Sequence, residues 1–158
     1  MKLVDEIRAQ LGDQWIAEIY EKRVRSQRTR AYHLDISARE NSPEILHTLL
    51  GIELKVANRR FACPDLATAR YMRVFARLGC HSFAVPYDIT KISVIADELE
   101  TLWHQMLLFV DDQMKGRETS IKGRVRSSLV RKLRDEIDAI GAGDAMPAFD
   151  RPTRQSGR

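Results

Sequence analysis

The stretch GIELKV, residues 51–56, carries an acid and a base two positions apart. In a strand, side chains two residues apart point to the same face, so Glu53 and Lys55 would lie side by side. A carboxylate can hold a hard cation such as Mg²⁺, and a neighbouring lysine can orient water or stabilise charge on a phosphoryl group. The pattern is therefore typical of a site that hydrolyses phosphodiesters. An ordinary strand with one solvated face shows the same alternation, so the sequence also permits that simpler explanation.

Such a magnesium site needs a second carboxylate from upstream, because Mg²⁺ is commonly held by one or two carboxylates and water. The candidates include Glu44 in SPE and Asp35 in HLDIS. Residues 44–50, EILHTLL, are too few for periodicity to separate a helix from a strand. If they are helical, Glu44 points elsewhere and Asp35 is the better ligand. We therefore predict catalytic roles for Glu53 and Lys55, with Glu44 or Asp35 completing the metal site and Mg²⁺ or Mn²⁺ as the cofactor.

Basic residues gather in two segments, and arginine outnumbers lysine by nineteen to seven. Residues 22–30 hold five basic residues and no acid, and residues 115–134 hold eight basic residues against one acid. The planar guanidinium fork suits phosphate oxygens, so these segments predict a nucleic-acid partner. The predicted contacts are Arg23, Arg25, Arg28, Arg30, Arg124, Arg131 and Arg134. Basic runs are also common on helix faces that only contact solvent, and the sequence leaves that explanation open.

Apolar spacing, proline and glycine indicate the elements that would position these residues. Pro64 and Asp65 are typical of a helix start, and Gly79 is typical of a helix end. The predicted elements are a helix at 2–28 kinked at Gly12, strands at 31–37, 51–56 and 80–86, a possible strand at 60–63, and helices at 64–79, 92–114 and 119–140.

This order of elements predicts an α/β or α+β fold with a small mixed sheet. Residues 1–140 would form a single globular domain, in which residues 1–87 hold the sheet and residues 88–140 form a helical hairpin. Residues 141–158 show no periodicity, and we expect a disordered tail there.

The order also resembles the core of the PD-(D/E)xK nuclease superfamily, which includes restriction enzymes and Holliday-junction resolvases. Members share an αβββαβ core with an acid-x-Lys signature on a central strand, and the ELK of GIELKV, beginning at Glu53, matches that signature. A helix at 64–79 and a strand at 80–86 follow it, as in resolvase-like members. Glu44 follows a proline where the family has Pro-Asp. The resemblance covers residues 1–87 and implies a metal-dependent nuclease acting on DNA or structured nucleic acid.

The helix at 92–114 supports a different class of function. Its apolar stripe is wide and includes Trp103, so it could exceed what one small sheet covers. On this alternative the protein is a non-catalytic regulatory or scaffold domain that binds a protein partner, or forms a homodimer, through this helix. A third possibility is nucleic-acid binding without catalysis, which salt-sensitive affinity without a metal requirement would reveal.

The composition, 44% apolar and 30% charged, is that of a soluble globular protein. The longest apolar run, MLLFV at 106–110, is far too short to span a bilayer, so we expect no membrane partner. The N-terminus has acids among its first residues and no apolar block, which argues against a secretory signal and favours a cytoplasmic location. Cys63 and Cys80 have apolar neighbours and are expected to be buried, inert thiols.

Overall fold

The structure is a computed structural model that describes residues 2–143. Its helices are α1 (Lys2–Leu11), the 3₁₀ turn η1 (Gly12–Gln14), α2 (Ile16–Ile19), the π-helical turn η2 (Tyr20–Val24), α3 (Leu66–Leu78), α4 (Ile89–Gln113) and α5 (Thr119–Ile140). Its strands are β1 (Thr29–His33), β2 (Glu44–Thr48), β3 (Gly51–Val56), β4 (Arg59–Cys63) and β5 (Ser82–Pro86). Residues 144–158 of the predicted tail lie outside the described residues.

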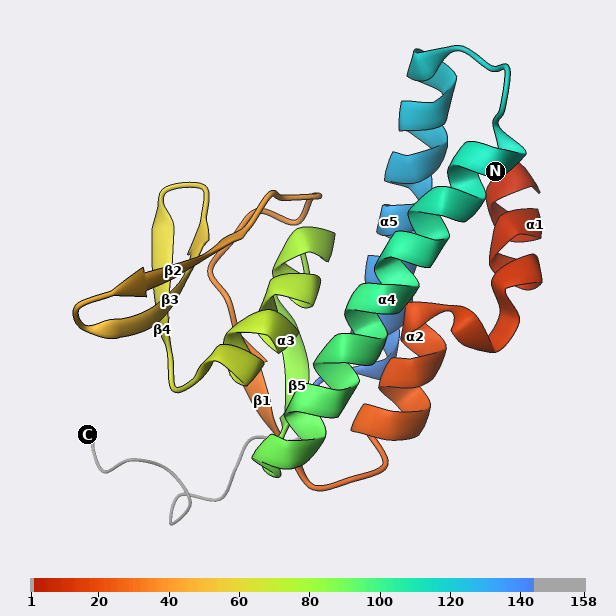
Figure 1. The fold of residues 1–158 in the computed structure, drawn as a ribbon. Helices are drawn as coiled ribbons and strands as arrows, with labels where there is room; N and C mark the ends of the chain where they lie inside the picture. The colour runs from red at the N-terminus through yellow and green to blue at the C-terminus, as the bar shows by residue number, and fades with distance from the viewer. Residues whose placement is uncertain (1, 144–158) are drawn as a thin grey trace.

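The N-terminal helical stretch is interrupted where the sequence predicts a kink. Gly12 has a φ of +55°, a conformation that glycine adopts at little cost, and α1 ends there. The chain then continues through η1, α2 and η2 before it enters β1. Figure 1 shows α1 and α2 lying on the same side of the long α4 helix.

Local signals define α3 at both ends. The Asp65 carboxylate accepts a hydrogen bond from the Thr68 amide at 2.7 Å, which satisfies one of the free N–H groups of the first turn. Gly79 ends the helix with a φ of +82°. A Cβ at Gly79 would lie 2.2 Å from the Arg39 carbonyl oxygen, so the residue must be glycine for a second reason. The helix begins at Leu66, two residues after the predicted start at Pro64, and its predicted end at Gly79 is confirmed.

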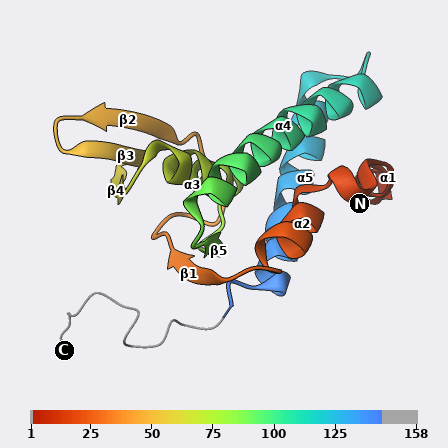
Figure 2. The ribbon, with the colours of Figure 1, turned by 60° about the horizontal axis from the view of Figure 1, so that its bottom comes forward.

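The strands form two sheets that are both antiparallel. β2, β3 and β4 make a three-stranded meander, and β1 pairs with β5 in a two-stranded sheet. The predicted mixture of helices and strands is confirmed, but the single mixed sheet is wrong. Residues 44–48 are strand, so the ambiguity of EILHTLL is resolved in favour of β2. Figures 1 and 2 both place the three-stranded sheet at the opposite end of the molecule from α1 and α2.

Burial explains why β5 is not part of the three-stranded meander. Four of its five residues are buried, whereas β2, β3 and β4 keep many exposed or half-buried positions. A strand that is apolar on both faces needs cover on both faces. Contacts with α4 and α5 supply part of that cover, and β1 alone pairs with its edge in the described chain.

The second edge of β5 is closed by two tyrosines. Ala84 lies opposite Ala31 at a position where its backbone N–H and C=O point away from β1. The Tyr20 hydroxyl accepts from the Ala84 amide at 2.8 Å, and the Tyr71 hydroxyl donates to the Ala84 carbonyl at 2.6 Å. Tyr20 also donates to the Gly141 carbonyl at 2.8 Å, which ties β5 to the end of α5. Burial raises the pKa of both phenols, so they stay protonated and keep these hydrogen bonds.

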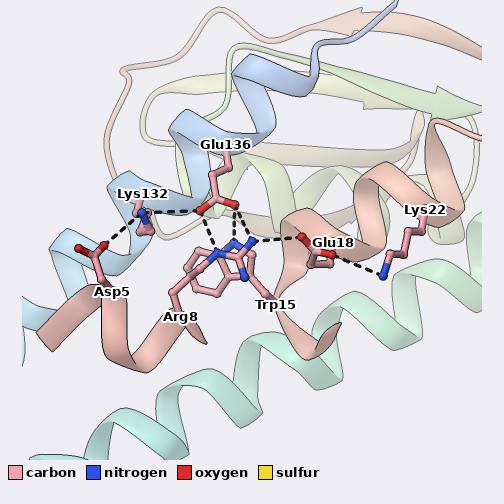
Figure 3. A network of polar contacts seen from close by, with 7 residues as sticks. All are labelled: Asp5, Arg8, Trp15, Glu18, Lys22, Lys132 and Glu136. Atoms are coloured by element: carbon pink, nitrogen blue, oxygen red, sulfur yellow. Dashed lines mark hydrogen bonds and ion pairs between the residues drawn. The ribbon is translucent and has the colours of Figure 1, made fainter. Parts of the chain in front are cut away.

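A polar network fastens the N-terminal helices to α5 (Figure 3). The Arg8 guanidinium donates to both carboxylate oxygens of Glu136, at 3.1 and 3.3 Å, and to Glu18 at 3.1 Å. The indole N–H of Trp15, which is fully buried, donates to the same Glu136 carboxylate at 3.0 Å. Lys132 and Lys22 extend the network to its two ends. One carboxylate on α5 therefore contacts both α1, through Arg8, and the residue that precedes α2, Trp15.

Candidate functional site

The register of the three-stranded sheet places three of the predicted site residues on one face. Glu44 of β2 lies opposite Lys55 of β3, and Glu53 lies two residues before Lys55 on the same face. Glu44 and Glu53 are thus diagonal neighbours across two strands, a separation of about 7 Å between backbone positions. The sequence pattern of β3 and the pairing of β2 bring these two carboxylates and one lysine together.

Glu53 is already paired on that face. Arg60 of β4 lies opposite Lys55, and its guanidinium donates to the Glu53 carboxylate at 3.2 Å. Glu44, Lys55 and Arg60 thus lie side by side across the three strands, and Glu53 lies beside them, two residues along β3. Acidic and basic side chains are therefore neighbours on this face. Opposite charges at such cross-strand positions stabilise a sheet by a few tenths of a kcal/mol each. The face shows the arrangement expected of a solvated strand surface.

Asp35 lies elsewhere. It follows β1, has a side chain 72% exposed, and forms an ion pair with Arg59 at 2.6 Å. Arg59 is opposite Val56, so it belongs to the other face of the sheet from Glu53. The structure separates Asp35 from Glu53 and Lys55, and leaves Glu44 as the upstream carboxylate on their face. Within residues 2–143, no three His, Cys, Asp or Glu residues come together as a metal-binding group.

The apolar stripe of α4 is buried within the monomer. Trp103 is 3% exposed, and the remaining members of the stripe are equally covered: Ile92, Ile95, Leu99, Leu102, Met106, Val110 and Met114. They pack against α3, α5, α2 and β5. The predicted partner or homodimer interface depended on this stripe, which is covered; the exposed apolar side chains of the helix, Val94 and Leu108, lie outside it.

The basic residues at 22–30 are largely engaged with the protein itself. Arg23 forms an ion pair with Glu98 of α4. Arg25 donates to the Thr29 hydroxyl at 3.2 Å. Arg28 and Arg30 stack over the Tyr87 ring, with guanidinium carbons 4.9 and 5.7 Å from its centroid. These side chains hold the η2–β1 segment against α4 and the end of β5.

The basic residues around α5 differ in this respect. Five basic side chains on α5 or just before it make no hydrogen bond or ion pair with any described residue. We call this set the α5 basic surface: Lys115, Arg117, Lys122, Arg124 and Arg131. Arg124 and Arg131 are seven residues apart, which places them on one face of the helix about 10 Å apart along its axis. Asp111, Asp112 and Glu118 lie nearby in sequence, and the region remains strongly positive.

Arg134 corrects one expectation about α5. The sequence predicts it as a nucleic-acid contact like Arg124 and Arg131, but it is half-buried and donates to the Leu78 carbonyl at 3.0 Å. This bond satisfies a free carbonyl at the end of α3. Arg126, by contrast, pairs with Glu40 and lies over the Trp103 ring.

The strongest pKa shifts belong to the core. Burial raises the pKa of Cys63 to about 11 and raises the pKa of Cys80 further. Both thiols are free, buried and protonated at neutral pH, as the sequence predicts. None of the helices in the described part of the chain is long and apolar enough to cross a lipid bilayer.

Comparisons with protein-family models, with curated proteins and with solved structures found no match to this chain. The functional argument therefore depends on the geometry of the chain itself. Sequence reasoning missed one basic residue that the structure brings next to Arg131 and Arg134. This is Arg39, which lies in the loop before β2 and lines a groove together with these two arginines. A lone arginine in the segment SARENSP carries no signal that would have found it.

Proposed function

We propose that the protein binds nucleic acid through the α5 basic surface, by contacts to backbone phosphates. The observation that carries the proposal is the set of cations on and before α5 without partners among residues 2–143, whereas the cations of residues 22–30 are engaged. Unpaired surface cations attract polyanions and release their counterions on binding. The spacing of Arg124 and Arg131, about 10 Å, equals about three steps of one DNA strand at an axial rise of 3.4 Å per step.

Fluorescence anisotropy with labelled single-stranded, duplex and four-way branched DNA tests this function. We expect binding to all three without added metal, and an affinity that falls steeply with salt. If about four phosphates are contacted, the slope of log K against log salt is about −3 to −4. Binding that does not change with salt, or no binding at low salt, would remove the proposal.

A second candidate is metal-dependent hydrolysis of phosphodiesters, as the nuclease resemblance implies. The observation in its favour is that Glu44, Glu53 and Lys55 share one sheet face. Two carboxylates are enough for Mg²⁺ or Mn²⁺, which keeps several waters. The metal would require Glu53 to exchange its contact with Arg60 for the cation.

The test of this candidate is cleavage of the same DNA substrates with Mg²⁺ or Mn²⁺. Glu53→Gln should abolish cleavage and leave DNA affinity unchanged, because the amide keeps the shape of the side chain but binds the cation poorly. Glu21→Gln, an exposed acid away from the sheet, is the matched control and should cleave like the wild type. Equal cleavage by both variants would assign any activity to another site.

A further inference from the structure

A groove lies between α5 and the loop that leads from β1 to β2. Its lining is Arg39, Glu40, Ser127, Val130, Arg131 and Arg134. Three of these six side chains are arginines, and Glu40 is the one acid among them. The Glu40 carboxylate is already paired with Arg126, which does not line the groove. The groove thus presents three guanidinium groups against one carboxylate, which is itself paired with an arginine outside the groove.

The Arg39 backbone is fixed at the edge of this groove. The Asn41 side-chain amide donates to the Arg39 carbonyl at 2.7 Å and to the Ala76 carbonyl of α3 at 3.1 Å. The Asn41 backbone amide donates to the Arg77 carbonyl at 3.0 Å. The close approach at Gly79 leaves no room between α3 and Arg39. Arg39 therefore has an anchored backbone and a side chain that makes no hydrogen bond or ion pair within residues 2–143.

The two arginines of α5 complete the arrangement from the other side. Arg131 is exposed and has no hydrogen bond or ion pair to a described residue. Arg134 is half-buried and uses one nitrogen, Nη1, to hold the Leu78 carbonyl. A guanidinium carries five N–H donors, so this bond fixes Arg134 while leaving most of its donors available. The Ser127 hydroxyl adds a neutral donor to the same groove.

We propose that this groove binds a phosphoryl group, held by Arg39 and Arg131 with Arg134 behind them. Three planar forks and a hydroxyl match the several oxygens of a phosphate, and a single carboxylate would leave most of these donors unused. The anchored backbone of Arg39 and the fixed side chain of Arg134 reduce the entropy that binding must overcome. The proposal rests on nucleic-acid binding by α5, and it assigns this groove as the place where one backbone phosphate binds.

The first experiment compares Arg39→Gln with Arg124→Gln as a matched control. Both variants remove one exposed cation without a partner among the described residues, but only Arg39 lines the groove. In the DNA anisotropy assay we expect Arg39→Gln to weaken binding about tenfold and Arg124→Gln about threefold, and each should reduce the salt slope by about one. Equal or smaller losses for Arg39→Gln, with DNA binding intact, would overturn the groove and leave the proposed function standing.

A positioning variant separates charge from placement. Asn41→Ala keeps every arginine but removes the side-chain bonds to the Arg39 and Ala76 carbonyls. We expect it to weaken DNA binding about threefold with an unchanged salt slope, because the number of cations that contact phosphates stays the same. Unchanged affinity in this variant would show that the phosphate contact of Arg39 does not depend on the anchored loop. A thermal melt of each variant checks that the fold is kept.

A second arm uses pyrophosphate as a free ligand and records amide chemical shifts by NMR. We expect shifts centred on Arg39, Ser127 and Arg131 that disappear in Arg39→Gln. If pyrophosphate binds this way but DNA does not bind at all, the groove stands as a site for a free phosphate compound and the nucleic-acid function falls. Shifts spread over the whole basic surface, unchanged in Arg39→Gln, would reject the groove whatever DNA does.

Discussion

Two parts of this molecule are rich in arginine and lysine, yet the side chains of the two parts make different contacts. In the segment 22–30, Arg23 contacts Glu98, Arg25 contacts Thr29, and Arg28 and Arg30 lie over Tyr87. On the α5 basic surface, five cations have no partner among the described residues. The first set joins η2 and β1 to α4 and β5, whereas the second set extends into solvent.

The difference shows that a count of basic residues is a poor guide to function. A cation that is paired with an acid must give up that contact before it can bind a phosphate, whereas an unpaired cation gives up only water. We therefore expect substitutions in the two regions to affect different properties of the protein. Changes at 22–30 should alter stability, and changes on α5 should alter binding.

The largest effect is expected from charge reversal on α5. Arg124→Glu combined with Arg131→Glu removes two phosphate contacts and adds two repelling charges. DNA affinity at low salt should fall on the order of a hundredfold, with little change in the free energy of unfolding. Anisotropy and urea denaturation measure the two quantities. If this variant binds DNA like the wild type, the α5 basic surface does not bind DNA, and the two regions do not differ in the way proposed.

The second effect is on stability and concerns the N-terminal network. Arg8→Met leaves Glu136 and Glu18 half-buried without their guanidinium partner, although Trp15 still donates to Glu136. We expect a loss of about 2 kcal/mol in the free energy of unfolding, because both partly buried carboxylates lose their hydrogen bonds from Arg8 and keep only Trp15 and the longer contacts with Lys22 and Lys132. Urea denaturation measures it, and a double-mutant cycle with Glu136→Gln isolates the pair. A loss below about 0.5 kcal/mol would show that the network does not hold α1 in place.

The third effect is a dependence of stability on pH. The hydrogen bond from Arg8 holds the pKa of Glu18 below its ordinary value of 4.5. Burial alone would raise the pKa of Glu100, but hydrogen bonds from Arg70 and Arg73 bring it below the same value. A carboxyl with a lowered pKa in the folded state stabilises the fold fully above 4.5 and loses that contribution as the pH falls through the folded value.

The free energy of unfolding, measured by urea denaturation from neutral pH downward, should therefore be constant until the pH approaches 4.5 and then fall. Glu18→Gln should reduce the size of that fall, and Asp13→Asn, which changes an exposed acid that forms no ion pair with the described residues, should not. A profile in which Glu18→Gln and the wild type fall together would show that Arg8 does not hold the Glu18 carboxylate.

The smallest effect is expected at Arg23. Its ion pair with Glu98 is largely exposed, and pairs of this kind contribute about 0.5 kcal/mol. Arg23→Gln should reduce stability by about that amount and leave DNA affinity and its salt slope unchanged. This variant is the counterpart of Arg124→Gln. A tenfold loss of DNA affinity in Arg23→Gln would mean that the paired segment also binds phosphate.

The elements that the sequence predicts well are those with local signals. Asp65 and Gly79 mark the ends of α3 because capping depends on a few adjacent residues. The long helices α4 and α5 follow from apolar spacing alone. Strand partners are not local, so the pairing of β5 with β1 and the separate meander could not be read from the same patterns.

The candidate sites were predictable to different degrees for the same reason. Alternation in GIELKV correctly placed Glu53 and Lys55 on one face, but only the register with β2 shows that Glu44 joins them and that Asp35 does not. Charge counts found the α5 cations and could not tell them from Arg23, whose partner Glu98 is 75 residues away. Arg39 reaches Arg131 through the tertiary packing of its loop on α3.

The tyrosines beside β5 have a consequence for how this chain avoids aggregation. Ser82–Pro86 is a short apolar strand, the type of segment that pairs with other chains when its backbone edge is open. One edge is covered by β1, and at the other the Tyr20 and Tyr71 hydroxyls occupy the amide and carbonyl of Ala84. Two phenol hydroxyls thus make the hydrogen bonds that a third strand would make at Ala84. They hinder a strand of a neighbouring molecule from pairing with this edge of the sheet.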